Sequence, residues 1–99
     1  MDGDLAKNKP AGGTDAEEQA RLLKVLGNPW RLQIVSLLAE RPRQVGEIEE
    51  ALELGQAYVS QQLARLRTEG VVEGDRSGRA VQYRIVDARI QPVLQALRR

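Results

Sequence analysis

Cysteine and histidine are both absent from the 99-residue sequence, and so is phenylalanine. Without thiols or imidazoles the chain has no disulfide, no thiolate or imidazole metal site, and no catalytic arrangement that depends on either residue. An enzyme would then need a carboxylate pair in a pocket, but the acids gather on a helix face that is predicted to be exposed. We therefore expect a protein that is not an enzyme and that has no cofactor.

The N-terminus lacks a run of apolar residues, so we expect neither a signal peptide nor a membrane anchor. Residues 1–13 are interpreted as a flexible polar arm, and residues 14–99 as the single domain of a cytoplasmic protein. Large side chains are few, because the only aromatics are Trp30, Tyr58 and Tyr83. Such a small chain commonly completes its core by dimerisation.

Charge is divided unevenly along the sequence, although the net charge is only +1. Residues 1–55 carry −3 and residues 56–99 carry +4, and every cation after Lys24 is an arginine. Arginine presents a fork of donors that suits phosphates and base edges. The asymmetry indicates a polyanion partner for the C-terminal half, and a chance unevenness of the surface would explain it equally well.

Apolar periodicity predicts four helices before residue 70. Thr14 and Glu17 form a capping box for the first, and Asn28-Pro29 offers an N-cap and a first-turn proline for the second. The second helix is apolar nearly all round, which places it at the centre of the fold. The helices are expected to start near Thr14, Trp30, Val45 and Gln56, and to end at Gly27, about Glu40, Leu52 and Gly70. The first carries a wide stripe made of Ala16, Ala20, Leu22, Leu23, Val25 and Leu26.

After Gly70 the period changes to two, because Val81, Tyr83 and Ile85 alternate with polar residues. Val71-Val72 supplies an antiparallel partner strand, with a turn around residues 76–79. Asp87 is expected to cap a last helix, which Pro92 either interrupts or begins. The predicted fold is mainly α with a small β-hairpin, in the order of four helices, two strands and a helix.

Two short helices joined by a glycine-containing turn and followed by a basic hairpin predict a winged helix-turn-helix. The third helix carries its acids outward, whereas the fourth has no acidic side chain from Gln56 to Thr68. Amide and hydroxyl groups can read base edges in a major groove, where a carboxylate would be repelled by the phosphates. The predicted DNA contacts are Gln56, Ala57, Tyr58, Ser60, Gln61, Gln62 and Arg65 on the helix, and Arg76, Ser77, Gly78 and Arg79 at the hairpin tip.

Two alternatives stay open at this point. A solvated helix face and a charged turn would carry the same residue types, although the set as a whole favours DNA because it lies in the second helix of the motif. Tyr58 either stacks on a thymine methyl group or a sugar, or packs against the hairpin. The alternative function is a protein-interaction module that docks its basic hairpin on an acidic partner.

From about Leu22 to Leu97 the sequence resembles the ArsR/SmtB class of bacterial dimeric winged-helix repressors. The resemblance is carried by LGNPWRLQIVSLL, VGEIEEAL, LGQAYVSQQLARLRTEGVV and DRSGRAVQYRI. It implies a homodimer that binds a near-palindromic double-stranded operator and leaves it when an inducer, unknown here, arrives. It also implies a dimer interface between the first and last helices, which we assign to Leu22, Ile90, Val93, Leu94 and Leu97.

The sequence departs from the pattern of that class at several positions. Gly55 replaces the usual serine before the recognition helix, Ala57-Tyr58 replaces a frequent Pro-Ala pair, and Gln62 replaces a frequent histidine, so base preference is expected to differ. Metal-sensing members use cysteines or Asp/His pairs that this chain lacks, so no transition-metal response is expected. Thiol-sensing relatives, the branch most similar to this chain, carry a cysteine where Ser36 stands. Either the input is different or Ser36 is an engineered replacement, and a buried hydroxyl bonded to its own helix explains the residue as well.

Overall fold

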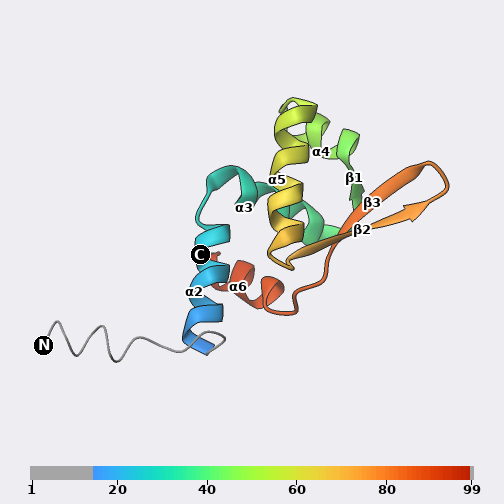
Figure 1. The fold of residues 1–99 in the computed structure, drawn as a ribbon. Coiled ribbons are helices and arrows are strands. Elements are labelled where there is room, and N and C mark those ends of the chain that lie inside the picture. Colours follow the sequence, from blue (N-terminus) through green and yellow to red (C-terminus); the bar gives the residue numbers. More distant parts are fainter. Residues whose placement is uncertain (1–14, 99) are drawn as a thin grey trace, which may run out of the picture.

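The computed structural model describes residues 15–98, apart from the side chain of Ser77. The elements in chain order are α2 (Asp15–Leu26), α3 (Pro29–Glu40), β1 (Arg43–Gln44), α4 (Val45–Leu52), α5 (Gln56–Thr68), β2 (Val72–Ser77), β3 (Ala80–Ile85) and α6 (Ile90–Leu97). The expected arm at residues 1–13 and the expected cap Thr14 lie outside the described residues. Figure 1 shows the hairpin of β2 and β3 projecting away from the side where α2 and α6 lie. Among the described helices, none combines the length and the apolar character that a bilayer-crossing segment needs.

Asn28 starts α3, as the sequence predicts. Its side-chain oxygen Oδ1 accepts hydrogen bonds from the backbone N–H groups of Trp30 (2.9 Å) and Arg31 (3.0 Å). The first N–H groups of a helix have no partner within it, so this cap satisfies two of them. Pro29 occupies the first helical position, where the N–H that proline lacks would be unpaired anyway.

The core surrounds α3, which lies centrally as predicted. Ile34 and Val35 have no exposed surface, and Leu38 is nearly as well buried. Burial of each such side chain stabilises the fold by about 1.5–3 kcal/mol. The other elements contribute Leu22, Val25, Leu26, Ile48, Val59, Leu63, Leu66, Val71, Val72, Ile90 and Leu94 to the same cluster.

The apolar stripe of α2 is narrower than the sequence predicts. Leu22, Val25 and Leu26 are buried, but Ala16, Ala20 and Leu23 are exposed. α2 is a peripheral helix that packs against α3 on one face only, so the residues beside that face remain in contact with solvent.

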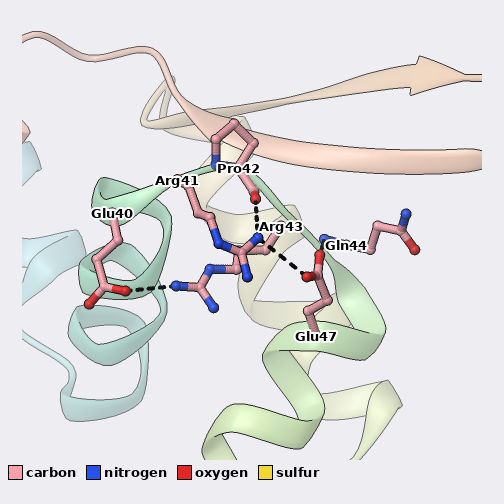
Figure 2. A network of polar contacts seen from close by, with 6 residues as sticks. All are labelled: Glu40, Arg41, Pro42, Arg43, Gln44 and Glu47. Atoms are coloured by element: carbon pink, nitrogen blue, oxygen red, sulfur yellow. Dashed lines mark hydrogen bonds and ion pairs between the residues drawn. The ribbon is translucent and has the colours of Figure 1, made fainter.

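Charged residues hold the corner between α3 and α4 (Figure 2). The Arg43 guanidinium donates to Glu40 Oε1 (2.7 Å), and Arg41 Nη1 lies 3.3 Å from Glu47 Oε2. Glu47 Oε1 also accepts a hydrogen bond from the backbone N–H of Gln44 (2.8 Å), which completes a capping box at the start of α4. This N–H, and after it the Arg41 guanidinium, hold the pKa of the Glu47 carboxyl below its ordinary value.

The predicted hairpin forms, and a third strand that the sequence analysis did not predict joins it. The sheet is antiparallel with the order β1-β3-β2. Ser77 pairs with Ala80, so residues 78–79 form the turn at the tip. β1 pairs Arg43 with Tyr83 and thereby joins the base of the hairpin to the corner between α3 and α4.

The chain requires glycine at two positions between the end of α5 and the middle of β2. Gly70 follows α5 with a φ of 76°, in the left-handed region that favours glycine, and ends the helix as predicted. Gly74 lies in β2 beneath side chains of β3. A Cβ atom at this position would stand 2.9 Å from Val81 Cγ1 and 3.2 Å from Tyr83 Cε1, so a larger residue would displace one or both side chains.

Asp87 does not cap α6, contrary to the prediction. Its Oδ1 accepts from the N–H of Arg89 (2.9 Å) within an additional turn, and the helix begins only at Ile90. The Arg89 side chain returns to the same carboxylate (Nη2–Oδ2 2.7 Å), and this hydrogen bond lowers the pKa of Asp87. Pro92 neither interrupts nor begins the helix, because it lies in the first turn, where its missing N–H breaks no helical hydrogen bond.

Candidate nucleic-acid interface

α5 turns a row of uncharged polar and small side chains away from the core. Val59, Leu63 and Leu66 are buried, so helical periodicity places Gln61 on the opposite side. No acidic residue occurs among the 13 residues of this helix. A groove of nucleic acid could approach this face without meeting a carboxylate on it. The members of the predicted contact set that are exposed on α5 are Gln56, Ala57, Ser60, Gln61 and Arg65.

Tyr58 and Gln62 lie at the edge of this face and are half-buried. Gln62 was predicted to face outward, but its Oε1 accepts a hydrogen bond from Arg31 Nη1 of α3 (3.2 Å). Part of the Gln62 amide is therefore engaged within the chain. Arg65 forms a loose ion pair with Glu69 one turn later, with 3.7 Å between Nε and Oε2.

The hairpin tip carries two arginines that are available to a partner. Arg76 and Arg79 are exposed, and neither forms an ion pair within residues 15–98. Gly78 is exposed between them, whereas the side chain of Ser77 lies outside the described part. Guanidinium groups at an exposed tip suit phosphates or an adjacent minor groove.

Below the tip, the two acids of the hairpin both pair with one arginine. Arg84 Nε lies 2.5 Å from Asp75 Oδ2, and its Nη2 lies 3.2 Å from Glu73 Oε1. The hydrogen bond to Asp75 is the main reason that the pKa of Arg84 is raised. Sequence analysis missed this network. The pattern that predicts the network is a pair of acids two residues apart on one strand face, opposite a single arginine. This pattern can be recognised only when the register of the two strands is known.

The residues predicted for the dimer interface divide into two groups. Leu22, Ile90 and Leu94 are buried in the core of the single chain, so they are not available to a second copy. Val93 is half-buried, whereas Leu97 of α6 is 60 % exposed. Leu23 of α2, which was not assigned to the interface, is 63 % exposed. The apolar surface of the two terminal helices is therefore smaller than expected and includes Leu23.

Ser36 forms a hydrogen bond to its own helix. Its Oγ donates to the carbonyl oxygen of Leu32, at 2.9 Å. This confirms the bonding that was considered for this residue, but the side chain is exposed and not buried. Within residues 15–98, no group of three acidic side chains converges in a way that would hold a metal ion.

Comparison with known proteins agrees with this geometry. A family model described as bacterial regulatory protein, arsR family, matches residues 28–74, from the cap of α3 to the start of the hairpin. The chain is 42 % identical over 82 residues to a biofilm growth-associated repressor of Xylella fastidiosa, and the match covers 83 % of this chain and 72 % of that protein.

Solved structures share the fold. HlyU from Vibrio cholerae superposes with a TM-score of 0.81 and 32 % identity, over 86 % of this chain and 92 % of that one. A homodimeric winged helix-turn-helix DNA-binding domain from Mycobacterium bovis gives a TM-score of 0.75 and 32 % identity, over 89 % and 86 % of the two chains.

The element order and the hairpin confirm the winged helix-turn-helix that the sequence predicts, and the relatives confirm the resemblance on which the family was predicted. The proteins of this family regulate transcription and are not enzymes. The chain therefore belongs to the arsR family of bacterial regulatory proteins and has a winged helix-turn-helix fold.

Proposed function

We propose that two copies of this chain bind a near-palindromic operator and repress transcription there until a signal removes them. As a member of the arsR family, the protein is a DNA-binding transcriptional repressor. The proposal adds the symmetry of the operator, the pairing of two copies and the release. It places the protein in the cytoplasm, where the bacterial chromosome lies.

The observation that carries the proposal is the combination of an acid-free helix face with a basic tip whose arginines form no ion pair within residues 15–98. Gln61 is exposed at the centre of the outward face of α5, and Arg76 and Arg79 are exposed on the hairpin. Amide groups at the centre of such a face can donate to and accept from base edges in the major groove. The arginines at the hairpin tip can bind phosphates beside the groove and fix the register. The chemistry of the two parts is complementary to one duplex surface.

The second copy is proposed to pack on the terminal helices. Leu97 and Leu23 are large apolar side chains with more than half of their surface exposed. α2 and α6, which carry these leucines, lie away from the hairpin (Figure 1). The same surface of another chain would cover exposed leucines on these helices. Two recognition helices related by a two-fold axis then enter successive major grooves about 34 Å apart.

A mobility-shift and footprinting experiment tests the proposal. The probe is the DNA upstream of the protein's own gene, in the presence of excess competitor DNA. We expect saturable, sequence-selective binding, with two protected half-sites about one helical turn apart. Affinity should also fall steeply with salt concentration, because phosphate contacts release counterions. A flat salt response would contradict the electrostatic part of the proposal.

Dimerisation is tested separately with Leu97→Glu and with a matched control, Gln95→Glu. Both positions are exposed on α6, so neither change should unfold the chain. Leu97→Glu should yield a monomer in analytical ultracentrifugation and lose the two-half-site footprint, whereas Gln95→Glu should do neither. If the protein binds no DNA selectively at low salt but does bind an acidic protein, the repressor proposal is wrong and the alternative, a protein-interaction module, is favoured.

A further inference from the structure

One side chain joins α2, α3 and α5. Arg31 lies in the first turn of α3, and its Nε donates a hydrogen bond to the backbone carbonyl of Val25 in α2, at 2.6 Å. Its Nη1 donates to the side-chain oxygen Oε1 of Gln62 in α5, at 3.2 Å. A single guanidinium thus connects the end of one terminal helix to the proposed recognition helix.

The contact with Val25 satisfies a group that α2 itself leaves open. Val25 belongs to the last turn of α2, where the final carbonyls have no N–H partner within the helix. A cationic donor at this end also suits the negative end of the helix dipole, and such charge-assisted hydrogen bonds are short. The link from Arg31 to α2 is therefore the firmer of the two.

α2 and α5 themselves are separated by a polar groove. Its walls carry Arg21 and Lys24 from α2, Arg65 from α5, and Glu69, the residue that follows α5. Both helices pack on α3, from which Arg31 projects. Because charged side chains separate the two helices along this groove, hydrogen bonds through Arg31 provide a defined connection between them.

The same contact fixes the orientation of the Gln62 amide. The oxygen accepts from Arg31, so the NH2 group is turned away from that guanidinium. A glutamine that reads adenine uses both ends of its amide. With the oxygen held, the NH2 group is left to donate to a phosphate or to acceptors such as guanine N7 and O6 or thymine O4.

We propose that Arg31 is a positioning residue for operator binding, which holds the Gln62 amide in one orientation and anchors it to the end of α2. This inference rests on the proposed function, because it requires that α5 contacts DNA. Arg31 acts through Gln62 and does not itself touch the operator.

The test is a double-mutant cycle on the operator that footprinting identifies, with wild type, Arg31→Ala, Gln62→Ala and the double variant. We expect each single variant to bind about three- to tenfold more weakly, as the loss of one to two hydrogen bonds predicts. The double variant should bind no more weakly than the weaker single variant, because both changes break the same interaction. Fully additive effects, or a Gln62→Ala variant with wild-type affinity, would overturn the proposal.

Arg31→Lys serves as the second variant if Arg31→Ala fails to fold. A lysine keeps the charge near the Val25 carbonyl, but its single ammonium group lacks the fork that reaches both acceptors. It should therefore retain wild-type unfolding behaviour and lose discrimination at one base pair, measured on operators altered at each position in turn. Wild-type discrimination in Arg31→Lys would exclude the positioning role. If the wild-type protein itself selects no DNA, the proposed function fails first, and this inference fails with it.

Discussion

α4 and α5 are adjacent helices of one motif, and they differ in how they use charge. α4 carries Glu47, Glu49 and Glu50, and its first turn is fixed by the hydrogen bond between Glu47 and the Gln44 N–H. α5 has no acid in its length and no side-chain cap, since Gly55 stands at its N-cap. Both helices bury an apolar face in the same core. The inward faces of the two helices are thus both apolar. The outward faces differ in charge, and only that of α5 is suited to a polyanion.

The largest effects should come from the inward faces, where the two helices are alike. Ile48→Ala in α4 and Leu63→Ala in α5 each remove a side chain that is at most 1 % exposed. Each variant should lower the free energy of unfolding by about 2–5 kcal/mol, from lost burial and the cavity left behind. Urea denaturation measures this, with Ala51→Ser and Ala64→Ser at exposed positions as controls. A loss of unfolding free energy below about 1 kcal/mol in either variant would show that the inward faces of α4 and α5 do not contribute alike.

The next effect separates the outward faces. Gln61→Glu places a carboxylate on the exposed face of α5, where it would approach the phosphates of bound DNA. Operator affinity should fall roughly five- to tenfold, as a repulsion of about 1 kcal/mol or more implies, with unfolding unchanged. Glu50→Gln, the reverse exchange on α4, should change affinity much less. Fluorescence anisotropy with labelled operator distinguishes the two, and equal effects would refute the division of roles.

A smaller effect is expected from the hairpin tip. Arg79→Ala removes a cation that forms no ion pair with the described residues, so the slope of log affinity against log salt should become shallower by about one unit. Arg41→Ala removes an arginine that already pairs with Glu47 at the corner before α4. That variant should leave the slope unchanged. Salt titrations from low to moderate ionic strength measure both slopes, and an unchanged slope in Arg79→Ala would argue against a phosphate contact at the tip.

The smallest effect concerns pH and belongs to the α4 side. The pKa of Glu47 is lowered by the Gln44 N–H and by Arg41. A carboxyl whose pKa is lower in the folded state stabilises the fold above its unfolded pKa, and this contribution disappears as the pH falls through the folded value. The stability difference between wild type and Glu47→Gln should therefore shrink from pH 7 to pH 3. Denaturation midpoints at several pH values measure it. A difference that grows in acid would contradict the assignment.

Local signals in the sequence were sufficient for most of the fold. Asn28-Pro29 marks the start of α3 because both residues act within one helical turn. Gly70 marks the end of α5 because its backbone conformation is the one that glycine permits most readily. The hairpin followed from alternation over a few residues. In each case the information lies within four or five residues of the feature.

Features that depend on distant parts of the chain were not predicted. β1 is only two residues long and exists because Arg43 meets Tyr83, forty residues later. The link between Arg31 and Gln62 likewise requires α3 and α5 to pack against each other. Asp87 has the right residue type for a cap, but one more turn before α6 moved the helix start to Ile90. The sequence predicted the residues of the candidate DNA face as a group. That Gln62 lies at the edge of this face follows only from the packing of α5 on α3.

Gly74 gives the hairpin a property that reaches beyond its own strand. A methyl group in place of one hydrogen would stand 2.9 Å from Val81 Cγ1 and 3.2 Å from Tyr83 Cε1, so either these side chains would move or the strand would bend. The tip is four residues further along, about 13 Å at the rise of an extended strand. A bend of roughly 10° at residue 74 would therefore displace the backbone of the tip by about 2 Å, enough to break a hydrogen bond between Arg79 and a phosphate. The direction in which the hairpin points thus depends on Gly74, a residue that has no side chain.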